Sequence, residues 1–245
     1  MSARMTFATA WRVLRQIRHD PRTVVMLIGV PCFLLVLLRY VFNGIPEAFQ
    51  QIGAPLCGLF PFIMMFVVTS ITMLRERMTG TLERLMSLPI AKLDLIAGYG
   101  VAFGILAVIQ AAAVCLVGFV ALGLDAAHGA WLVGILAVAN ATLGMTLGLL
   151  ASAFARTEFQ AVQFMPAFVL PQLLLCGLIT PRSTMAMWLQ DLARAMPLTY
   201  AYGALQRATE PGSMGRTLVV DVVVVLAMTF GALCLGALTL RRRTV

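Results

Sequence analysis

The residues able to do chemistry are few in this sequence and do not gather into the site of an enzyme. The two histidines, His19 and His128, have neither a carboxylate nor a second histidine at ligand spacing, which argues against a metal site or a Ser-His-Asp triad. The five cysteines lie far apart in apolar runs, without the spacing of a zinc site or a disulfide framework. The sequence also lacks a G-x-x-x-x-G-K-[ST] phosphate loop. An intramembrane enzyme, which would need paired carboxylates or a serine beside lysine or histidine at one depth, is therefore the weakest hypothesis.

Four polar side chains interrupt otherwise apolar runs, and their positions favour structural roles. Gln110 and Asn140 lie deep in uncharged runs, where a hydrogen bond between helices is favoured over contact with a substrate. Arg39 and Asp221 fall close to the ends of such runs. They could pair with each other, Asp221 could pair with Arg216, or both could snorkel to the headgroups.

The composition is that of a membrane protein. Hydrophobic residues make up 61% of the 245 residues and charged residues only 11%, against about 25% in a soluble domain. Such a chain cannot cover a globule with polar surface, and its long apolar runs exclude disorder. The net charge of +8 would suggest a nucleic-acid partner in a soluble protein. In a membrane protein it is the expected excess of Lys and Arg in cytoplasmic segments, so no nucleic acid is expected.

Six apolar runs are long enough to cross a hydrocarbon core, which takes about 20 residues of helix. Each should be helical, because a helix satisfies its own backbone hydrogen bonds in lipid whereas a lone strand cannot. Pro166 and Pro171 should kink the fifth of these helices. The sequence therefore predicts an all-α integral membrane protein with six transmembrane helices, at residues 24–42, 55–74, 95–124, 130–153, 161–179 and 217–240.

Most of the basic residues fall on one side of these spans. They cluster before the first span, between the second and the third, and after the sixth, where the tail carries Arg241, Arg242 and Arg243. The positive-inside rule then places both termini in the cytoplasm. Residues 1–23 are too charged for the apolar core of a secretory signal peptide, so none is expected before the first span.

Two segments outside the spans have the apolar periodicity of a helix. Residues 5–20 gather Phe7, Trp11 and other apolar side chains on one side and the arginines, Arg12 among them, on the other. This pattern predicts an amphipathic helix in the cytoplasmic interface, with a cleaved or disordered leader as the alternative. Residues 183–208 form two pieces that are too short to span, so they should dip into the outer leaflet or cap the bundle.

The segment that follows the second span cannot be stable by itself. Gly80 should end the helix that leaves the membrane and Pro89 should end whatever follows, which leaves at most two helical turns between them. A helix shorter than about 12–15 residues is marginal in water. Its apolar face, formed by Leu82, Leu85 and Met86, must be covered by the N-terminal helix or by another protein. Another protein is favoured, because the cytoplasmic segments of the chain are too small to build a core.

This segment resembles the intracellular loop of type-2 ABC transporter permeases, such as the daunorubicin-resistance and polysaccharide-export membrane subunits. The first match is Arg75-Glu76-Arg77, then Gly80-Thr81-Leu82-Glu83-Arg84-Leu85, then Pro89-Ile90. The second match is Pro166, Leu178-Ile179-Thr180-Pro181, Trp188-Leu189 and Pro197-Leu198-Thr199-Tyr200. The resemblance covers nearly the whole chain. The sequence departs from the family at Met78-Thr79, where relatives vary, and at Thr180, where an aromatic residue is common.

The resemblance implies the membrane subunit of an ABC exporter in the bacterial inner membrane. Residues 1–23 would be a connecting helix and residues 24–245 a six-helix permease domain. Residues 80–88 would be a coupling helix seated in a separate ATPase subunit. That subunit would hold ATP and Mg²⁺, so no cofactor is expected in this chain. The coupling residues implied by the family are Glu76, Gly80, Thr81, Leu82, Glu83, Arg84, Leu85 and Pro89.

The resemblance also implies how the assembly would work. Closure of two ATPase subunits would rock the helices between inward-facing and outward-facing states. Six spans are half of such a transporter, so a second permease copy or a close relative is expected. The second and fifth spans line the path in the family, which makes candidates of Phe60, Phe62, Phe66 and Gln172. The cargo would be a drug, lipid or glycan, and fold does not fix which.

Two other functions stay open from the sequence. An ion-gradient-driven carrier tends to have ionisable residues at the middle of a span, and this sequence has none there. A non-transporting membrane scaffold would show no substrate-stimulated ATPase activity with any partner. Two G-x-x-x-G patterns, Gly100–Gly104 and Gly144–Gly148, permit close helix approach, which in a six-span bundle indicates packing within the chain more than dimerisation.

Overall fold

The fold is a bundle of helices, described from a computed structural model of the chain. The structure describes residues 3–81, 84–85, 92–212 and 215–239, and their regular segments are all helical. Within these residues, five helices are long and apolar enough to cross a membrane, namely Pro21–Val41, Pro46–Met78, Asp94–Ala121, Ala130–Ser152 and Arg216–Gly236. The prediction of an all-α integral membrane protein is confirmed.

The helix that contains the second predicted span begins at Pro46, before residue 55. Helix α4 runs from Pro46 to Met78 and continues through Pro55 and Pro61, both of which are buried. Neighbouring helices can re-satisfy the backbone groups that a proline frees, so a buried membrane helix tolerates it. The first spanning helix consists of α2 (Pro21–Val24), the π-helical turn η1 (Val25–Gly29) and α3 (Val30–Val41). The next after α4 consists of α6 (Lys92–Cys115) and the π-helical turn η2 (Leu116–Ala121). The other two are α7 (Ala130–Ser152) and α12 (Arg216–Thr239).

The predicted fifth span, residues 161–179, is divided into three helical pieces. They are α8 (Glu158–Phe164), the π-helical turn η3 (Met165–Val169) and α9 (Leu170–Leu175). Pro166 lies inside the π-helical turn and Pro171 in the first turn of α9, as expected for prolines that disturb the helix at these points. This segment is not among the five spanning helices, so the count of six spans stays a prediction.

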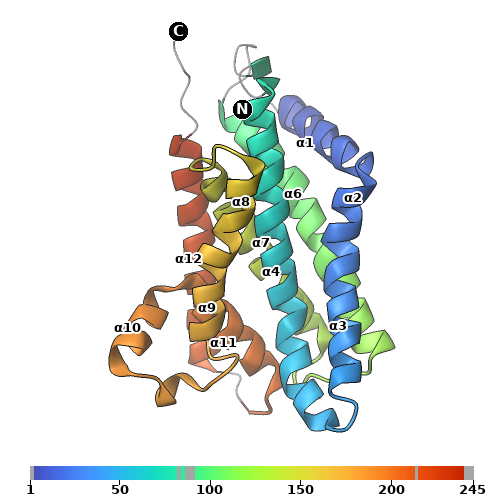
Figure 1. The fold of residues 1–245 in the computed structure, drawn as a ribbon, viewed down its shortest axis with the longest axis vertical. Helices are drawn as coiled ribbons and strands as arrows, with labels where there is room; N and C mark the ends of the chain where they lie inside the picture. The colour runs from blue at the N-terminus through green and yellow to red at the C-terminus, as the bar shows by residue number, and fades with distance from the viewer. Residues whose placement is uncertain (1–2, 82–83, 86–91, 213–214, 240–245) are drawn as a thin grey trace.

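The connections are divided between the two ends of the bundle. Helix α1 (Ala3–Arg18), the end of α4 and the last turn of α12 share one end, at the top of Figure 1. The turn between α3 and α4, together with α10 (Met187–Ala195) and α11 (Pro197–Thr209), lies at the other end. This is the arrangement expected if the first end is cytoplasmic.

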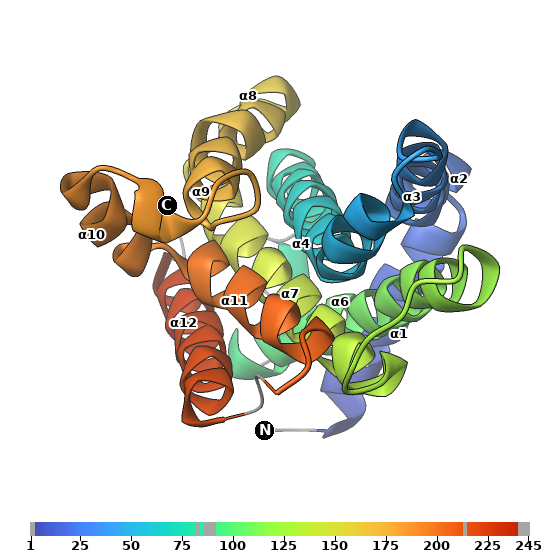
Figure 2. The same cartoon turned by 90° about the horizontal axis from the view of Figure 1, so that it is seen from below.

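The centre of the bundle is the contact between α4 and α7, which Figure 2 shows with the other helices around it. A Cβ atom added at Gly144 would lie 2.1 Å from the carbonyl oxygen of Phe62, and one at Gly148 would lie 2.4 Å from that of Phe66. The predicted close approach at Gly144–Gly148 is therefore packing within the chain. At Gly100 and Gly104 an added Cβ would meet nothing within 4 Å, so this pair makes no such contact.

Polar side chains fix the position of α11. Asn140 Nδ2 on α7 donates to the carbonyl oxygen of Ala201 at 3.3 Å, which confirms the interhelical hydrogen bond predicted for Asn140. The same prediction is wrong for Gln110, whose side-chain amide is buried without a hydrogen-bond partner among the described residues. Gln172 Nε2 donates to the carbonyl of Phe168, and its Oε1 accepts from the backbone N–H of Leu198 at 3.3 Å. This last bond satisfies one of the free N–H groups at the start of α11.

A buried ion pair joins α11 to α12. Arg207 pairs with Asp221, so neither of the two partners that the sequence left open for Asp221, Arg39 and Arg216, forms this ion pair. The reason is that α11 turns back into the bundle and brings Arg207 beside the first turns of α12. Arg39 instead places its guanidinium over the ring of Phe49, 5.5 Å from the centroid.

Asp221→Asn is expected to lower the free energy of unfolding by about 2–3 kcal/mol, because it removes the carboxylate charge from the ion pair that joins Arg207 to α12. Thermal unfolding of the purified protein in detergent measures this loss. Asp191→Asn is the matched control, since it breaks the exposed pair with Arg194 and should cost under about 1 kcal/mol. Equal losses in the two variants would show that the Arg207–Asp221 pair does not hold α12.

Candidate functional site

The helix that leaves the membrane ends where the sequence predicts. Thr79 terminates α4, its hydroxyl donating to the carbonyl of Arg75 at 2.9 Å. Gly80 follows with φ +70°, a left-handed conformation that residues with a Cβ atom adopt only under strain. The chain then changes direction, and the N–H of Arg84 bonds back to the carbonyl of Gly80 at 3.0 Å. Gly80 is thus the hinge that sets the direction of the predicted coupling segment.

Part of the predicted coupling helix is described. Thr81, Arg84 and Leu85 are helical. Leu82, Glu83 and Pro89 lie outside the described residues, as do the other residues of 86–91. Leu85 is partly buried and packs against the apolar cluster that includes Ala10, Val13 and Ile17 of α1. At Leu85, therefore, an apolar cluster of this chain, to which α1 contributes along with α4 and α6, provides part of the cover.

Helix α1 packs against α6 with part of the predicted apolar face, to which Ala10, Val13 and Ile17 belong. Thr9, Ala10, Val13 and Ile17 are buried, and Gly98 of α6 allows close contact at Thr9. Phe7 and Trp11, predicted to share the face of Ala10 and Val13, are instead 66% and 68% exposed. The helix is held to the bundle by small and branched side chains, and its aromatic side chains face outward.

Arg12 was expected on the polar face of α1, yet it turns into the bundle and binds Glu76. Its Nη1 and Nη2 donate to Oε1 and Oε2 of Glu76 at 3.0 and 3.1 Å. Tyr99 of α6 donates its hydroxyl to Glu76 Oε2 at 2.8 Å and accepts from Arg12 Nη2 at 2.8 Å. We call these three residues the clamp. It joins α1, α4 and α6 at the end of the helix that leads into the coupling segment.

The clamp is a charged network in which the Glu76 carboxylate and the Tyr99 hydroxyl have hydrogen-bond partners, whereas Arg12 Nε is buried without one. Glu76 is only 3% exposed, so its carboxylate depends on Arg12 and Tyr99 in place of water. Burial alone would lower the pKa of Arg12, but the hydrogen bond to Glu76 and the nearby charges raise it above its ordinary value. Arg12 is therefore charged at every physiological pH, and the bidentate geometry fixes the angle at which α1 meets α4.

A second, exposed tie lies beside the clamp. Arg75 Nε donates to Glu158 Oε1 of α8 at 2.7 Å, and Arg75 Nη1 lies 3.7 Å from Asp20 Oδ2, at the turn between α1 and α2. The hydrogen bond from Arg75 lowers the pKa of Glu158. Both partners are nearly half exposed, so this tie adds little stability. It does connect the end of α4 to the segments on either side.

The predicted substrate-path residues differ in what they face. Phe62 and Gln172 are buried within the chain, and Phe60 is half-buried. Phe66 stacks on Phe168, with ring centroids 6.4 Å apart. Phe66 also lines an apolar pocket of about 210 Å³ between α4, α7, α8 and η3, whose other walls are Leu147, Leu150, Ala151, Phe154, Phe164 and Phe168. The role of all four in a substrate path stays a prediction.

Comparison with known proteins places the chain in a family. The profile of the ABC-2 type transporter family matches residues 4–209. The chain is 30% identical over 145 residues to the probable multidrug ABC transporter permease YbhR of Escherichia coli K12, an alignment that covers 59% of this chain and 39% of that protein. It is 25% identical over 148 residues to ABC transporter G family member 20 of Dictyostelium discoideum, covering 60% of this chain and 20% of that protein.

The chain spans less than half the length of these relatives. The family match, in contrast, extends from α1 through the clamp, the described part of the coupling segment and the aromatic pocket to the end of α11. The family profile matches most of the chain, and the chain forms an all-helical bundle with several spanning helices. This multi-pass membrane protein therefore belongs to the ABC-2 type transporter family.

Proposed function

We propose that this chain is the membrane subunit of an ABC exporter in the bacterial inner membrane and that it forms half of the translocation path. A separate ATPase subunit supplies the energy, holding ATP and Mg²⁺, and a second copy of the chain or a close relative completes the path. The observation that carries the proposal is the clamp at Glu76, because it links the start of the coupling segment to α1 and α6.

The clamp supports coupling because it converts a push on a short segment into a movement of several helices. A force applied after Gly80 acts on the end of α4, where Glu76 is bonded to Arg12 and Tyr99. Helix α1 would follow through Arg12, and α6 through Tyr99. Three elements would then move as one body, which is the rigid-body behaviour that alternating access requires.

The aromatic pocket supports a cargo with an apolar part. Its lining contains no polar side chain, and its volume of about 210 Å³ exceeds the 150 Å³ or so of an engineered cavity that binds benzene. Four phenylalanines would bind aromatic or aliphatic groups through their faces and edges. Drugs and lipids fit this lining better than an unmodified glycan does.

Gly80→Pro and the double variant Glu83→Ala/Arg84→Ala are expected to insert normally but to uncouple ATP hydrolysis from transport. Proline holds φ near −65° and cannot reproduce the +70° of Gly80, so the coupling segment would point in another direction. Transport per ATP hydrolysed should fall about tenfold, the middle of the usual range for coupling free energies. Reconstitution with the ATPase subunit in proteoliposomes gives both rates.

Gly212→Pro is the matched control for this experiment. Gly212 also has a positive φ, +75°, and lies at the opposite end of the bundle, where an added Cβ would meet nothing within 4 Å. The control should disturb the backbone locally and leave coupling intact. Normal export and an unchanged ATPase response in the Gly80 and Glu83/Arg84 variants would contradict the coupling role. Transport that survives ATP depletion but stops with a protonophore would indicate an ion-driven carrier instead.

A further inference from the structure

One cation at the end of α4, Arg77, has no counter-charge among the residues that the structure describes. Arg77 is half-buried, and its Nε atom is buried without a hydrogen-bond partner. Its neighbours are satisfied, since Arg12 holds Glu76 and Arg75 holds Glu158. Among the described residues no carboxylate lies within ion-pair distance of Arg77. A guanidinium partly withdrawn from water without an acceptor is costly, which points to an anion that the described part of the chain does not supply.

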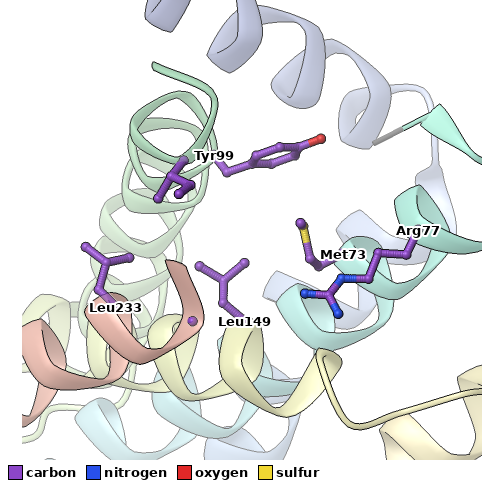
Figure 3. Close-up of a pocket in the computed structure, with 7 residues that line it drawn as sticks. Met73, Arg77, Tyr99, Leu149 and Leu233 are labelled. Atoms are coloured by element: carbon purple, nitrogen blue, oxygen red, sulfur yellow. The ribbon is translucent and has the colours of Figure 1, made fainter. Parts of the chain in front are cut away.

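The pocket that Arg77 enters is apolar apart from Arg77 itself and one hydroxyl. Figure 3 shows its side chain reaching into the space between Met73, Tyr99 and Leu149. Ile96 of α6 and Leu233 and Gly236 of α12 complete the walls. The hydroxyl of Tyr99 is already bonded to the clamp. The walls therefore offer the guanidinium no acceptor, and they favour a ligand that joins an anionic group to hydrocarbon.

The surroundings of the pocket fit a phospholipid. The pocket holds only about 20 Å³, enough for an oxygen of a headgroup but not for a larger anion, so the rest of the ligand must lie outside. Leu235 and Leu238 of α12, 55% and 75% exposed, offer apolar surface next to it. The pocket lies at the end of the bundle where the positive-inside rule places the cytoplasm, and the cytoplasmic leaflet carries anionic lipids.

We propose that Arg77 binds the phosphate of an anionic phospholipid from the inner leaflet, with an acyl chain along the exposed side of α12. A guanidinium matches phosphate because its N–H groups donate charge-assisted hydrogen bonds to phosphate oxygens. Pairing with the phosphate would relieve the unsatisfied charge of Arg77 and fill the gap between α4, α6 and α12.

The test titrates phosphatidylglycerol into the purified full-length chain in neutral detergent, with bound lipid counted by native mass spectrometry. Arg77→Met is expected to bind phosphatidylglycerol about tenfold more weakly, because it removes a charge-assisted hydrogen bond while keeping an apolar side chain of similar length. Arg156→Met, which removes an exposed charge at the same end, should bind as the wild type does. Equal binding by Arg77→Met and the wild type would overturn the proposal.

Two further measurements decide between the remaining interpretations. Without lipid, Arg77→Met should be at least as thermally stable as the wild type, because an unpaired charge has been removed. A less stable variant would mean that Arg77 supports the fold itself, which would overturn the lipid assignment. Millimolar inorganic phosphate should not displace phosphatidylglycerol from the wild type. Displacement would identify a free-anion site and would also overturn the assignment.

Discussion

Replacing Glu76 by alanine is expected to be among the most damaging single changes in this protein. The variant leaves Arg12 turned into the bundle without its bidentate carboxylate and leaves the hydroxyl of Tyr99 without its acceptor. Removing one member of a buried charged pair costs about 3–5 kcal/mol, and the value here should lie near the lower limit because Arg12 is 33% exposed. Thermal unfolding in detergent measures the loss. Arg75→Gln, which breaks the neighbouring exposed tie, should cost under about 1 kcal/mol.

A double variant separates stability from coupling at the same site. Arg12→Met/Glu76→Leu removes both charges together, and apolar replacement of a buried ion pair is often neutral or stabilising. The double variant should therefore unfold close to the wild-type temperature but still transport poorly, because α1 is no longer fixed to α4 in one orientation. A double variant that recovers full transport would show that the clamp only stabilises the fold and plays no part in coupling.

The clamp could not be predicted from the sequence. Its members are separated by 64 residues between Arg12 and Glu76 and by 23 between Glu76 and Tyr99, so no local pattern relates them. Arg12 fits a polar helix face as well as Arg15 and Arg18 do. A signal was present in the motif Arg75-Glu76-Arg77, because an acidic residue flanked by two arginines at the end of a membrane helix needs a partner. No local pattern identifies Arg12 and Tyr99 as the partners of Glu76.

The spanning helices could be predicted because a backbone in hydrocarbon must satisfy its own hydrogen bonds. Runs of apolar residues had to be helical, and the ends of α7 and the start of α12 fall within one residue of those expected. The early start of α4 was missed because Pro55 has the appearance of a boundary, whereas packing around it sustains the helix. Local composition also could not show that α11 folds back to bring Arg207 beside Asp221, because that contact depends on the whole bundle.

The contact between α4 and α7 should be the place where the fold least tolerates added volume. A Cβ atom at Gly144 would lie 2.1 Å from the carbonyl oxygen of Phe62. The obstacle is backbone inside a helix, so no change of rotamer relieves it, and the two helices must separate. Gly144→Ala is expected to cost about 2–4 kcal/mol, and Gly144→Val more.

Gly134 on the same helix provides the control for this prediction, since an added Cβ there would meet nothing within 4 Å. Gly134→Ala should raise stability by up to about 1 kcal/mol, because alanine favours the helix and restricts the unfolded chain. The two alanine variants should thus shift the unfolding temperature in opposite directions. A Gly144→Ala variant as stable as Gly134→Ala would mean that α4 and α7 lie further apart than described. The close contact between α4 and α7, and the position of the aromatic pocket that lies between these two helices, would then be wrong.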